Sequence, residues 1–121
     1  MKAAIITGHG GMEVVQVAQD LPVPEAGPDQ VRVGIKAAAL NRLDLWVRLG
    51  WPGLNLTMPH IVCADGAGVV DAVGAGVTGF APGDRVCIDP TIVDPDSPAL
   101  LTGLENQSRI HILGESVPGV A

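Results

Sequence analysis

Three short segments carry residue types that could do chemistry. The first is NRLD, residues Asn41 to Asp44, which combines an amide, a guanidinium and a carboxylate. The second is Cys63 to Asp65, where a thiol that could ligate a metal stands two positions before a carboxylate. The third is Gly74 to Gly79, which matches the G-x-G-x-x-G pattern of dinucleotide-binding loops. The elements around each segment decide which of these chemistries is available.

The glycine motif lacks the helix that dinucleotide binding requires. In a true phosphate-binding loop a helix begins inside the motif and directs its first amides at the pyrophosphate. Here Phe80 to Asp84 follow directly, and they contain Pro82 and Gly83. Proline removes an amide donor and glycine disfavours helix, so no helix can continue from the motif. We therefore interpret it as a strand–turn–strand connection.

A helix is predicted from Asn41 to Arg48. Asn41 can cap the amides of the first turn, and Asp44 three residues later completes a capping box with a shorter acid. Arg48 complements the helix dipole, and Gly50 is a terminator. His9, which stands between glycines, is interpreted as a solvated turn residue.

The remaining pattern is that of strands and turns. Short apolar or alternating runs bounded by glycine and proline are typical of a partly open β-barrel. We expect the first two strands to form a hairpin, the segment from Asp65 to Gly68 to be a turn, and a short helix to start at Ser97-Pro98. The predicted strands are Lys2 to Thr7, Glu13 to Gln19, Gln30 to Ala39, Ala67 to Val73 and Arg85 to Ile88.

Length and charge restrict the classes of function. At 121 residues with a hydrophobic share of 47%, residues 1–121 form one globular domain. The net charge of −6 and the lack of a basic patch argue against nucleic acid or an anionic membrane as a partner. No apolar run approaches the ~20 residues of a membrane span. Two cysteines and no signal peptide predict a cytoplasmic protein with reduced thiols.

One long stretch resembles a known family. AGVVDAVGAGVTGFAPGDRV is similar to the central signature of the medium-chain dehydrogenase/reductase superfamily, which includes zinc alcohol dehydrogenases and zinc-independent quinone oxidoreductases. The likeness continues through MKAAIITGHGG, VRVGIKAAALNRLDLWVR and RIHILGE, and so covers about residues 1–119. The resemblance implies the GroES-like catalytic domain, which is mainly β with a few short helices.

The resemblance also assigns roles to the polar segments. It implies that Asn41, Asp44 and Asp65 are catalytic positions and that Arg42 contacts the cofactor pyrophosphate. Zinc members carry a cysteine ligand in the place of Asn41, a proton-relay hydroxyl in that of Leu43, and a Gly-His-Glu triplet where this chain has Cys63 to Asp65. Asn41 and Asp44 are equally well explained as helix caps, whereas Cys63 is better explained as a small buried hydrophobe than as a zinc ligand.

Zinc is not expected in this chain. Tetrahedral zinc needs about four thiolate, imidazole or carboxylate ligands, and Asn41, Ala64 and Asp65 offer at most one good one. Zinc-binding members also have a structural-zinc lobe with four cysteine ligands. In this chain all four cysteines are replaced, by Asp94, Ser97, Leu100 and Ser108. We expect no metal at either site.

Two functions are compatible with these observations. The first is the substrate-side domain of a zinc-independent NAD(P)-dependent oxidoreductase, which exchanges hydride with a carbonyl, quinone or activated alkene. NADP or NAD would bind only in a full-length parent with a C-terminal Rossmann domain, so this chain alone would be inactive. This oxidoreductase would act on a small-molecule substrate and could form a homo-oligomer. Its pocket walls would include four apolar residues that could equally be core, namely Leu43, Trp46, Trp51 and Leu54. The second is a non-enzymatic GroES-like binding or assembly module.

Overall fold

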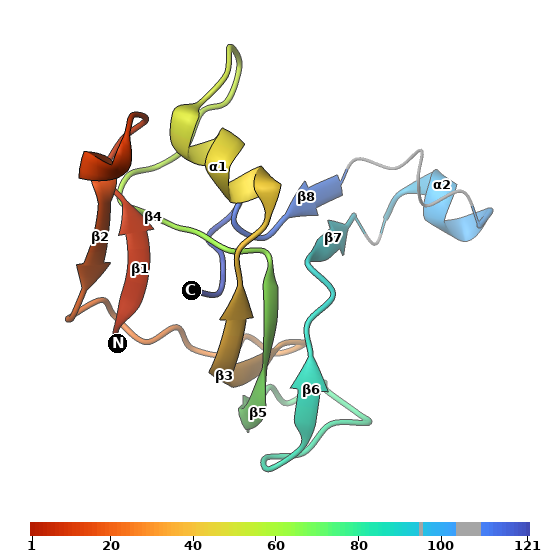
Figure 1. Cartoon of the computed structure of the whole chain (residues 1–121). Helices are drawn as coiled ribbons and strands as arrows, with labels where there is room; N and C mark the ends of the chain where they lie inside the picture. The colour runs from red at the N-terminus through yellow and green to blue at the C-terminus, as the bar shows by residue number, and fades with distance from the viewer. Residues whose placement is uncertain (95, 104–109) are drawn as a thin grey trace.

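The described residues form three small sheets that do not close into a complete barrel (Figure 1). The computed structural model describes residues 1–94, 96–103 and 110–121. The sheets have the strand orders β2-β1-β4, β3-β5-β6 and β7-β8. This arrangement confirms the expected mainly β, partly open barrel with a few short helices. The elements are β1 (Ala3–Ile6), η1 (Met12–Val14, a 3-10 turn), β2 (Val15–Ala18), β3 (Val31–Ala39), α1 (Arg42–Leu49), β4 (His60–Ile61), β5 (Asp65–Val73), β6 (Arg85–Cys87), β7 (Thr91–Val93), α2 (Pro98–Leu101) and β8 (Ile110–Ile112).

The predicted N-terminal hairpin is present. β1 and β2 are antiparallel, with Ile5 opposite Gln16 and Ile6 opposite Val15. The second strand is shorter than predicted because the 3-10 turn η1 occupies Met12–Val14. On its other side β1 pairs with β4, where Ile5 lies opposite Ile61. β1 is therefore the central strand of its sheet, which explains why its apolar side chains are buried.

The turn predicted at Asp65 to Gly68 is wrong, because these residues are the first part of β5. β5 pairs with β3 along its whole length, from Val31 opposite Val73 to Ala39 opposite Asp65. Gly66 and Gly68 of this strand are required because neighbouring residues approach their Cα atoms closely, and not because the chain turns there. A Cβ on Gly68 would lie 2.8 Å from Val33 Cγ1, and one on Gly66 would lie 2.9 Å from Val120 Cγ2.

The G-x-G-x-x-G segment is a connection between strands, as predicted. β5 ends at Val73, β6 begins at Arg85, and the residues between them form turns without a helix. The Gly74 N–H donates to Gln30 O over 2.8 Å, and the Gly76 N–H donates to Pro28 O over 2.7 Å. A Cβ on Gly74 would overlap the backbone of Gly27 and Pro28. These glycines therefore let two loops pack together, which explains the match without a nucleotide.

Residues 120 and 121 pack against the main core. The buried cluster comprises Ile6, Val47, Val62 and Cys63, and both Val120 and Ala121 pack against it. The Val120 N–H donates to Cys63 O over 2.9 Å, and the Ala121 N–H donates to Val62 O over 3.1 Å. The C-terminus thus lies beside β1 and the segment after β4 (Figure 1).

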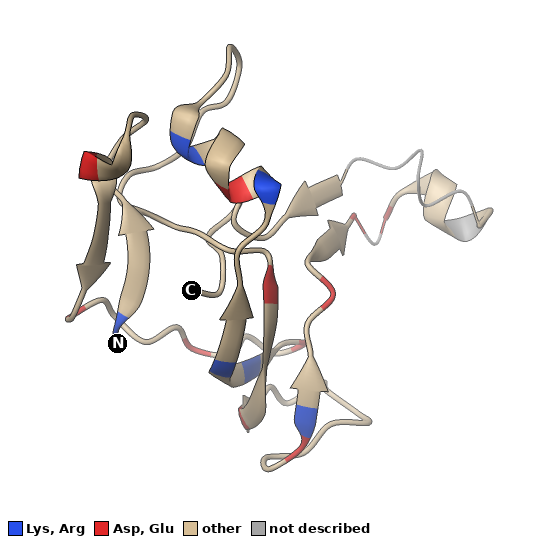
Figure 2. Cartoon of the chain, in the orientation of Figure 1, with Lys and Arg blue, Asp and Glu red and all other residues tan. Residues whose placement is uncertain are grey.

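The charged residues that the structure describes do not form a single basic face. Figure 2 shows Lys and Arg spread over the N-terminus, α1 and the sheet β3-β5-β6, with Asp and Glu among them. Within the described residues, an ion pair joins Arg32 Nε to Asp71 Oδ1 across β3 and β5 at 2.7 Å. In the part of the chain that the structure describes, no helix has the length and apolarity to cross a membrane.

Candidate functional site

Helix α1 begins where the capping signals predicted. Asn41 has extended backbone angles, φ −116° and ψ 166°, and forms a capping box with Asp44. The Asn41 N–H donates to Asp44 Oδ2 over 2.6 Å. The helix continues through Leu49, one residue beyond the prediction, and ends at Gly50, whose φ is +76°. Because the left-handed region favours glycine, Gly50 stops the helix at a defined residue.

The N-terminal hairpin holds the other end of α1. His9 lies in an exposed turn, as expected, but its ring Nδ1 lies 2.9 Å from Val47 O. The Gly10 N–H donates to Arg48 O over 2.9 Å, and Arg48 Nη1 donates back to Gly10 O over 3.0 Å. These contacts satisfy carbonyls that the last turn of a helix leaves free. His9 therefore contacts the C-terminal end of α1 and does not contact Asn41, Asp44 or Asp65.

Asp44 joins the start of α1 to the segment between β4 and β5. Its side chain is buried, with 6% of its surface exposed. Oδ2 accepts the Asn41 N–H over 2.6 Å, and Oδ1 accepts the Cys63 N–H over 2.8 Å. A buried carboxylate is tolerated when both oxygens accept hydrogen bonds in this way. Asp44 thereby holds Asn41 next to the segment that carries Asp65.

Asn41 and Asp65 are in direct contact. Asn41 Nδ2 donates to Asp65 Oδ2 over 2.9 Å. The sheet register explains the contact, because Asp65 lies opposite Ala39, two residues before Asn41. Asn41 is half-buried and Asp65 is exposed. The structure therefore brings together Asn41, Asp44 and Asp65, the three positions for which the sequence predicted a catalytic role.

The other predicted site residues lie around this cluster in different settings. Arg42 is exposed in the first turn of α1. Leu43 packs against the core, so the core alternative applies to it. Trp46 and Trp51 remain 55% and 41% exposed, so neither is a core residue within this chain. The helix thus presents the Arg42 guanidinium and the Trp46 indole to its surroundings, and the Trp51 indole is exposed just after the helix ends.

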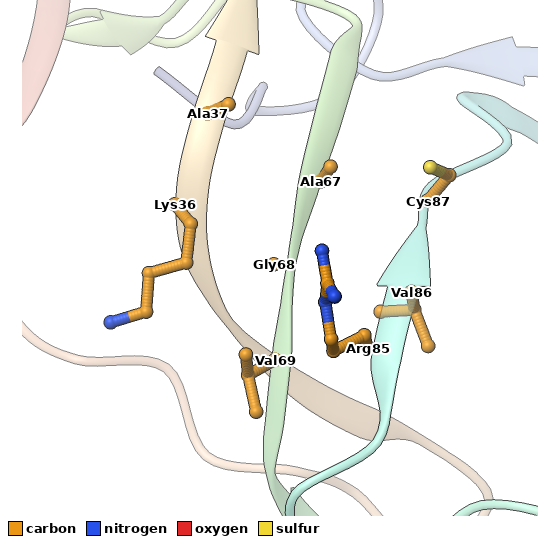
Figure 3. A pocket seen from close by; sticks show the side chains of 8 residues that line it. All are labelled: Lys36, Ala37, Ala67, Gly68, Val69, Arg85, Val86 and Cys87. Atoms are coloured by element: carbon orange, nitrogen blue, oxygen red, sulfur yellow. The ribbon is translucent and has the colours of Figure 1, made fainter.

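Two shallow hollows lie on the sheet β3-β5-β6. The larger, of about 450 Å³, extends over Gly68 between Lys36 and Arg85. Figure 3 shows the Arg85 guanidinium lying over the sheet while the Lys36 ammonium points away from it. The second, of about 360 Å³, is mainly apolar and is bordered by Ala38, Ile88 and Asp65. The Asn41–Asp65 pair therefore stands at the edge of an apolar surface.

The thiol of Cys63 is poorly suited to ligate a metal. Cys63 is 3% exposed and belongs to the core cluster, which confirms its prediction as a small buried hydrophobe. Burial raises its pKa to about 11, and the nearby carboxylates of Asp44 and Asp65 act in the same direction. The protonated thiol is therefore the form present at neutral pH, whereas zinc binds the thiolate.

The donor set as a whole does not fit zinc. Among the described residues, no group of three or more His, Cys, Asp or Glu side chains is placed to hold a metal ion. Asp44 uses both carboxylate oxygens for backbone amides, and Asp65 Oδ2 accepts the Asn41 amide. In the lobe compared with the structural-zinc site, Asp94, Ser97 and Leu100 are described, whereas Ser108 lies outside the described residues. Ser97 instead precedes α2, with Pro98 at its first position as predicted.

The sequence reading missed a buried histidine near the site. His60 is 3% exposed, and its Nε2 lies 3.1 Å from Gly114 O. A Cβ on Gly114 would lie 2.7 Å from the Cys63 carbonyl carbon. His60 therefore helps to hold the segment that packs behind Cys63. Its partner is 54 positions away, so no local pattern could reveal the contact.

Comparison with known proteins confirms the resemblance seen in the sequence. Residues 27–121 match the family described as the alcohol dehydrogenase GroES-like domain. A crystal structure of an NAD-dependent alcohol dehydrogenase is 53% identical, with a TM-score of 0.93 over 99% of this chain and 35% of that chain. An alcohol dehydrogenase of Schizosaccharomyces pombe is 47% identical over 85 residues, or 69% of this chain and 24% of the relative. A quinone oxidoreductase of Lama guanicoe is 33% identical over 92 residues, or 76% and 28%. The chain thus spans only about a quarter to a third of the length of these relatives.

Proposed function

Since the chain belongs to the family of alcohol dehydrogenase GroES-like domains, we propose that it is the substrate-side domain of an NAD(P)-dependent oxidoreductase that works without zinc. The substrate would be a carbonyl compound, a quinone or an activated alkene. A bound nicotinamide supplies hydride in such a reaction, and the protein supplies binding and orientation. The observation that carries the proposal is the hydrogen-bonded pair Asn41–Asp65, held by Asp44 at the edge of an apolar hollow.

The pair supports a metal-free site. Asn41 offers an amide, a neutral donor and acceptor that zinc sites rarely use. Asp65 has one oxygen bound to that amide, and the neighbouring thiol of Cys63 is held in its protonated form. An amide at this position can recognise a substrate oxygen by hydrogen bonding instead of by coordination.

We assign Arg42 to the cofactor. It is exposed in the first turn of α1, directly after Asn41. A guanidinium binds phosphate oxygens through paired, charge-assisted hydrogen bonds. The relatives are about three times as long as this chain, which is long enough to include a C-terminal Rossmann domain. Such a domain would hold the rest of the cofactor. Arg42 would then reach its pyrophosphate from this side of the cleft.

The proposal is tested on the native protein that carries this sequence. Its intact mass should exceed the 12.4 kDa of the 121 residues by the mass of a cofactor domain. It should oxidise NADPH or NADH with a quinone or an enone, at a rate that a zinc chelator leaves unchanged. Elemental analysis of protein purified without chelator should find well under one zinc per chain.

Other results would reject specific parts of the proposal. One zinc per chain, or loss of turnover on chelation, would reject the metal-free site. A native mass of 12.4 kDa without any turnover would favour the non-enzymatic binding or assembly module instead.

A further inference from the structure

We propose that Asp65 is a positioning residue, which orients the Asn41 amide so that its second N–H donates to the carbonyl oxygen of the substrate. The inference rests on the proposed function and specifies how this domain would recognise the oxygen. It arises from the 2.9 Å hydrogen bond between Asn41 Nδ2 and Asp65 Oδ2.

The carboxylate fixes which way the amide faces. An amide can in general present either its oxygen or its nitrogen to a partner. An ionised carboxylate accepts hydrogen bonds and has none to donate, so the nitrogen of Asn41 must face Asp65. The backbone of Asn41 is fixed at the start of α1, because its N–H donates to Asp44 Oδ2 over 2.6 Å and its oxygen accepts the Asp44 N–H over 3.1 Å. Helix α1 thus holds the backbone of Asn41, and Asp65 on strand β5 holds its side-chain amide.

This arrangement leaves one donor for a ligand. The Asn41 amide nitrogen carries two N–H groups, and one of them is bound to Asp65. Within the described residues, this nitrogen has no second acceptor, and Asn41 is half-buried and reachable from outside. The remaining N–H is therefore a donor with a fixed direction, and fixed donors are what recognition of a substrate oxygen requires.

The neighbouring surface indicates the substrate class. The hollow of about 360 Å³ beside Asp65 is mainly apolar and includes Ala38 and Ile88. It suits the hydrocarbon body of a carbonyl compound whose oxygen reaches the Asn41 amide. When hydride from a reduced nicotinamide adds to such a compound, the π electron pair moves onto the oxygen, which then takes a proton from water. A hydrogen bond to that oxygen stabilises the charge that develops there.

The geometric part of the inference can be tested on the 121-residue chain by NMR. The side-chain amide protons of Asn41 should exchange with water more slowly than those of Asn55, which is exposed. Asp65→Asn should abolish this difference. Asp71→Asn should preserve it, because Asp71 lies on the same strand and pairs with Arg32 in an exposed salt bridge. Exchange at Asn41 that Asp65→Asn leaves unchanged would overturn the inference.

The functional part uses turnover of NADPH with 2-cyclohexen-1-one by the native protein. Asp65→Asn should lower kcat by about 10²-fold, the effect of losing one oriented donor, while Asp71→Asn should stay within about twofold of the parent protein. The double exchange N41D/D65N is decisive. It restores an amide–carboxylate pair, and aspartate is also a good helix cap, but it moves the amide from the cap of α1 to the start of β5.

The double exchange should therefore recover the protection of the pair in NMR and leave kcat low. Recovery of kcat would show that the pair is merely structural and would contradict the inference. Full turnover in Asp65→Asn would reject the inference while the proposed function stands. Absence of turnover in the parent protein with NADPH and with NADH, and with both a quinone and an enone, would reject the proposed function itself if the NMR pattern is intact.

Discussion

The carboxylate of Asp44 accepts the backbone N–H of Cys63 over 2.8 Å and that of Asn41 over 2.6 Å. One buried side chain thus joins the first residue of a helix cap to a segment about twenty positions later. The Cys63 N–H has no other way to be satisfied once Asp44 is changed, because Cys63 is buried away from water.

Asp44→Asn should therefore lower the free energy of unfolding by about 3 kcal/mol. Asparagine keeps one acceptor but places an NH2 group against a backbone N–H, which leaves one buried donor unpaired. Urea unfolding followed by the fluorescence of Trp46 and Trp51 would measure the change. Asp71→Asn, in an exposed salt bridge, should cost at most about 1 kcal/mol, and equal effects of the two substitutions would contradict the role of Asp44.

The two cysteines should differ sharply in reactivity. Cys87 is exposed, whereas Cys63 is buried with a pKa of about 11. Since the thiolate is the reactive form, a chromogenic disulfide reagent at neutral pH should modify one thiol per chain quickly and the second only as the chain unfolds. Cys87→Ser should remove the fast phase. Two fast thiols in the parent chain would contradict the burial of Cys63.

Cys63 should also make stability depend on pH in the alkaline range. Its pKa is about 11 in the folded chain against an ordinary value of 9.0. The folded state therefore holds the thiol proton more tightly than the unfolded state does. The resulting contribution is complete below about pH 9 and is lost as the pH rises toward 11. Urea unfolding across this range should show a steeper decline for the parent chain than for Cys63→Ala, and parallel curves would refute the assignment.

How far sequence could predict this structure depends on the range of the contacts. The helix at Arg42–Leu49 was predictable because Asn41, Asp44 and Gly50 act within the helix itself. The N-terminal hairpin was predictable for the same reason, since its strands are neighbours in the chain. Local signals of this kind depend on a few adjacent residues, so they can be recognised in the sequence without knowledge of the overall fold.

The contacts that assemble the candidate site are of another kind. The Asn41–Asp65 and Asp44–Cys63 hydrogen bonds span 24 and 19 positions, and both depend on the pairing of β3 with β5. Gly66 and Gly68 misled the turn prediction because close backbone approach selects glycine just as a turn does. Only the packed structure distinguishes these two causes.

The glycine motif provides a direct test of that distinction. Gly74→Ala should lower the free energy of unfolding by about 2–3 kcal/mol, because its Cβ would overlap the backbone of Gly27 and Pro28. Gly8→Ala is the matched control, since no atom lies within 4 Å of its added Cβ. Thermal or urea unfolding should find Gly8→Ala nearly neutral. A neutral Gly74→Ala would mean that the two loops do not pack as described.

The 121-residue chain alone should not bind a nicotinamide cofactor tightly. Arg42 could add one charge-assisted contact to a phosphate, worth about 1.5–3 kcal/mol, which is too little to offset the entropy of association. The connection from Gly74 to Asp84 contains no helix that could hold a pyrophosphate. Calorimetric titration with NADPH and NADH should detect no micromolar binding. Micromolar affinity would contradict this prediction. If Arg42→Gln preserved that affinity, the Gly74–Gly79 segment would again be a candidate dinucleotide-binding loop.

The hydrogen bonds of the final residues also set an order of events during synthesis. Ala121 O accepts the Ala4 N–H over 3.2 Å, and the Ala121 N–H donates to Val62 O over 3.1 Å. The first strand therefore gains this partner only when residue 121 has been translated. At bacterial or eukaryotic elongation rates this delay is on the order of ten seconds. A two-stranded hairpin is marginal by itself for that time, so the core around Ile6 and Val62 cannot be covered by residues 120 and 121 until then.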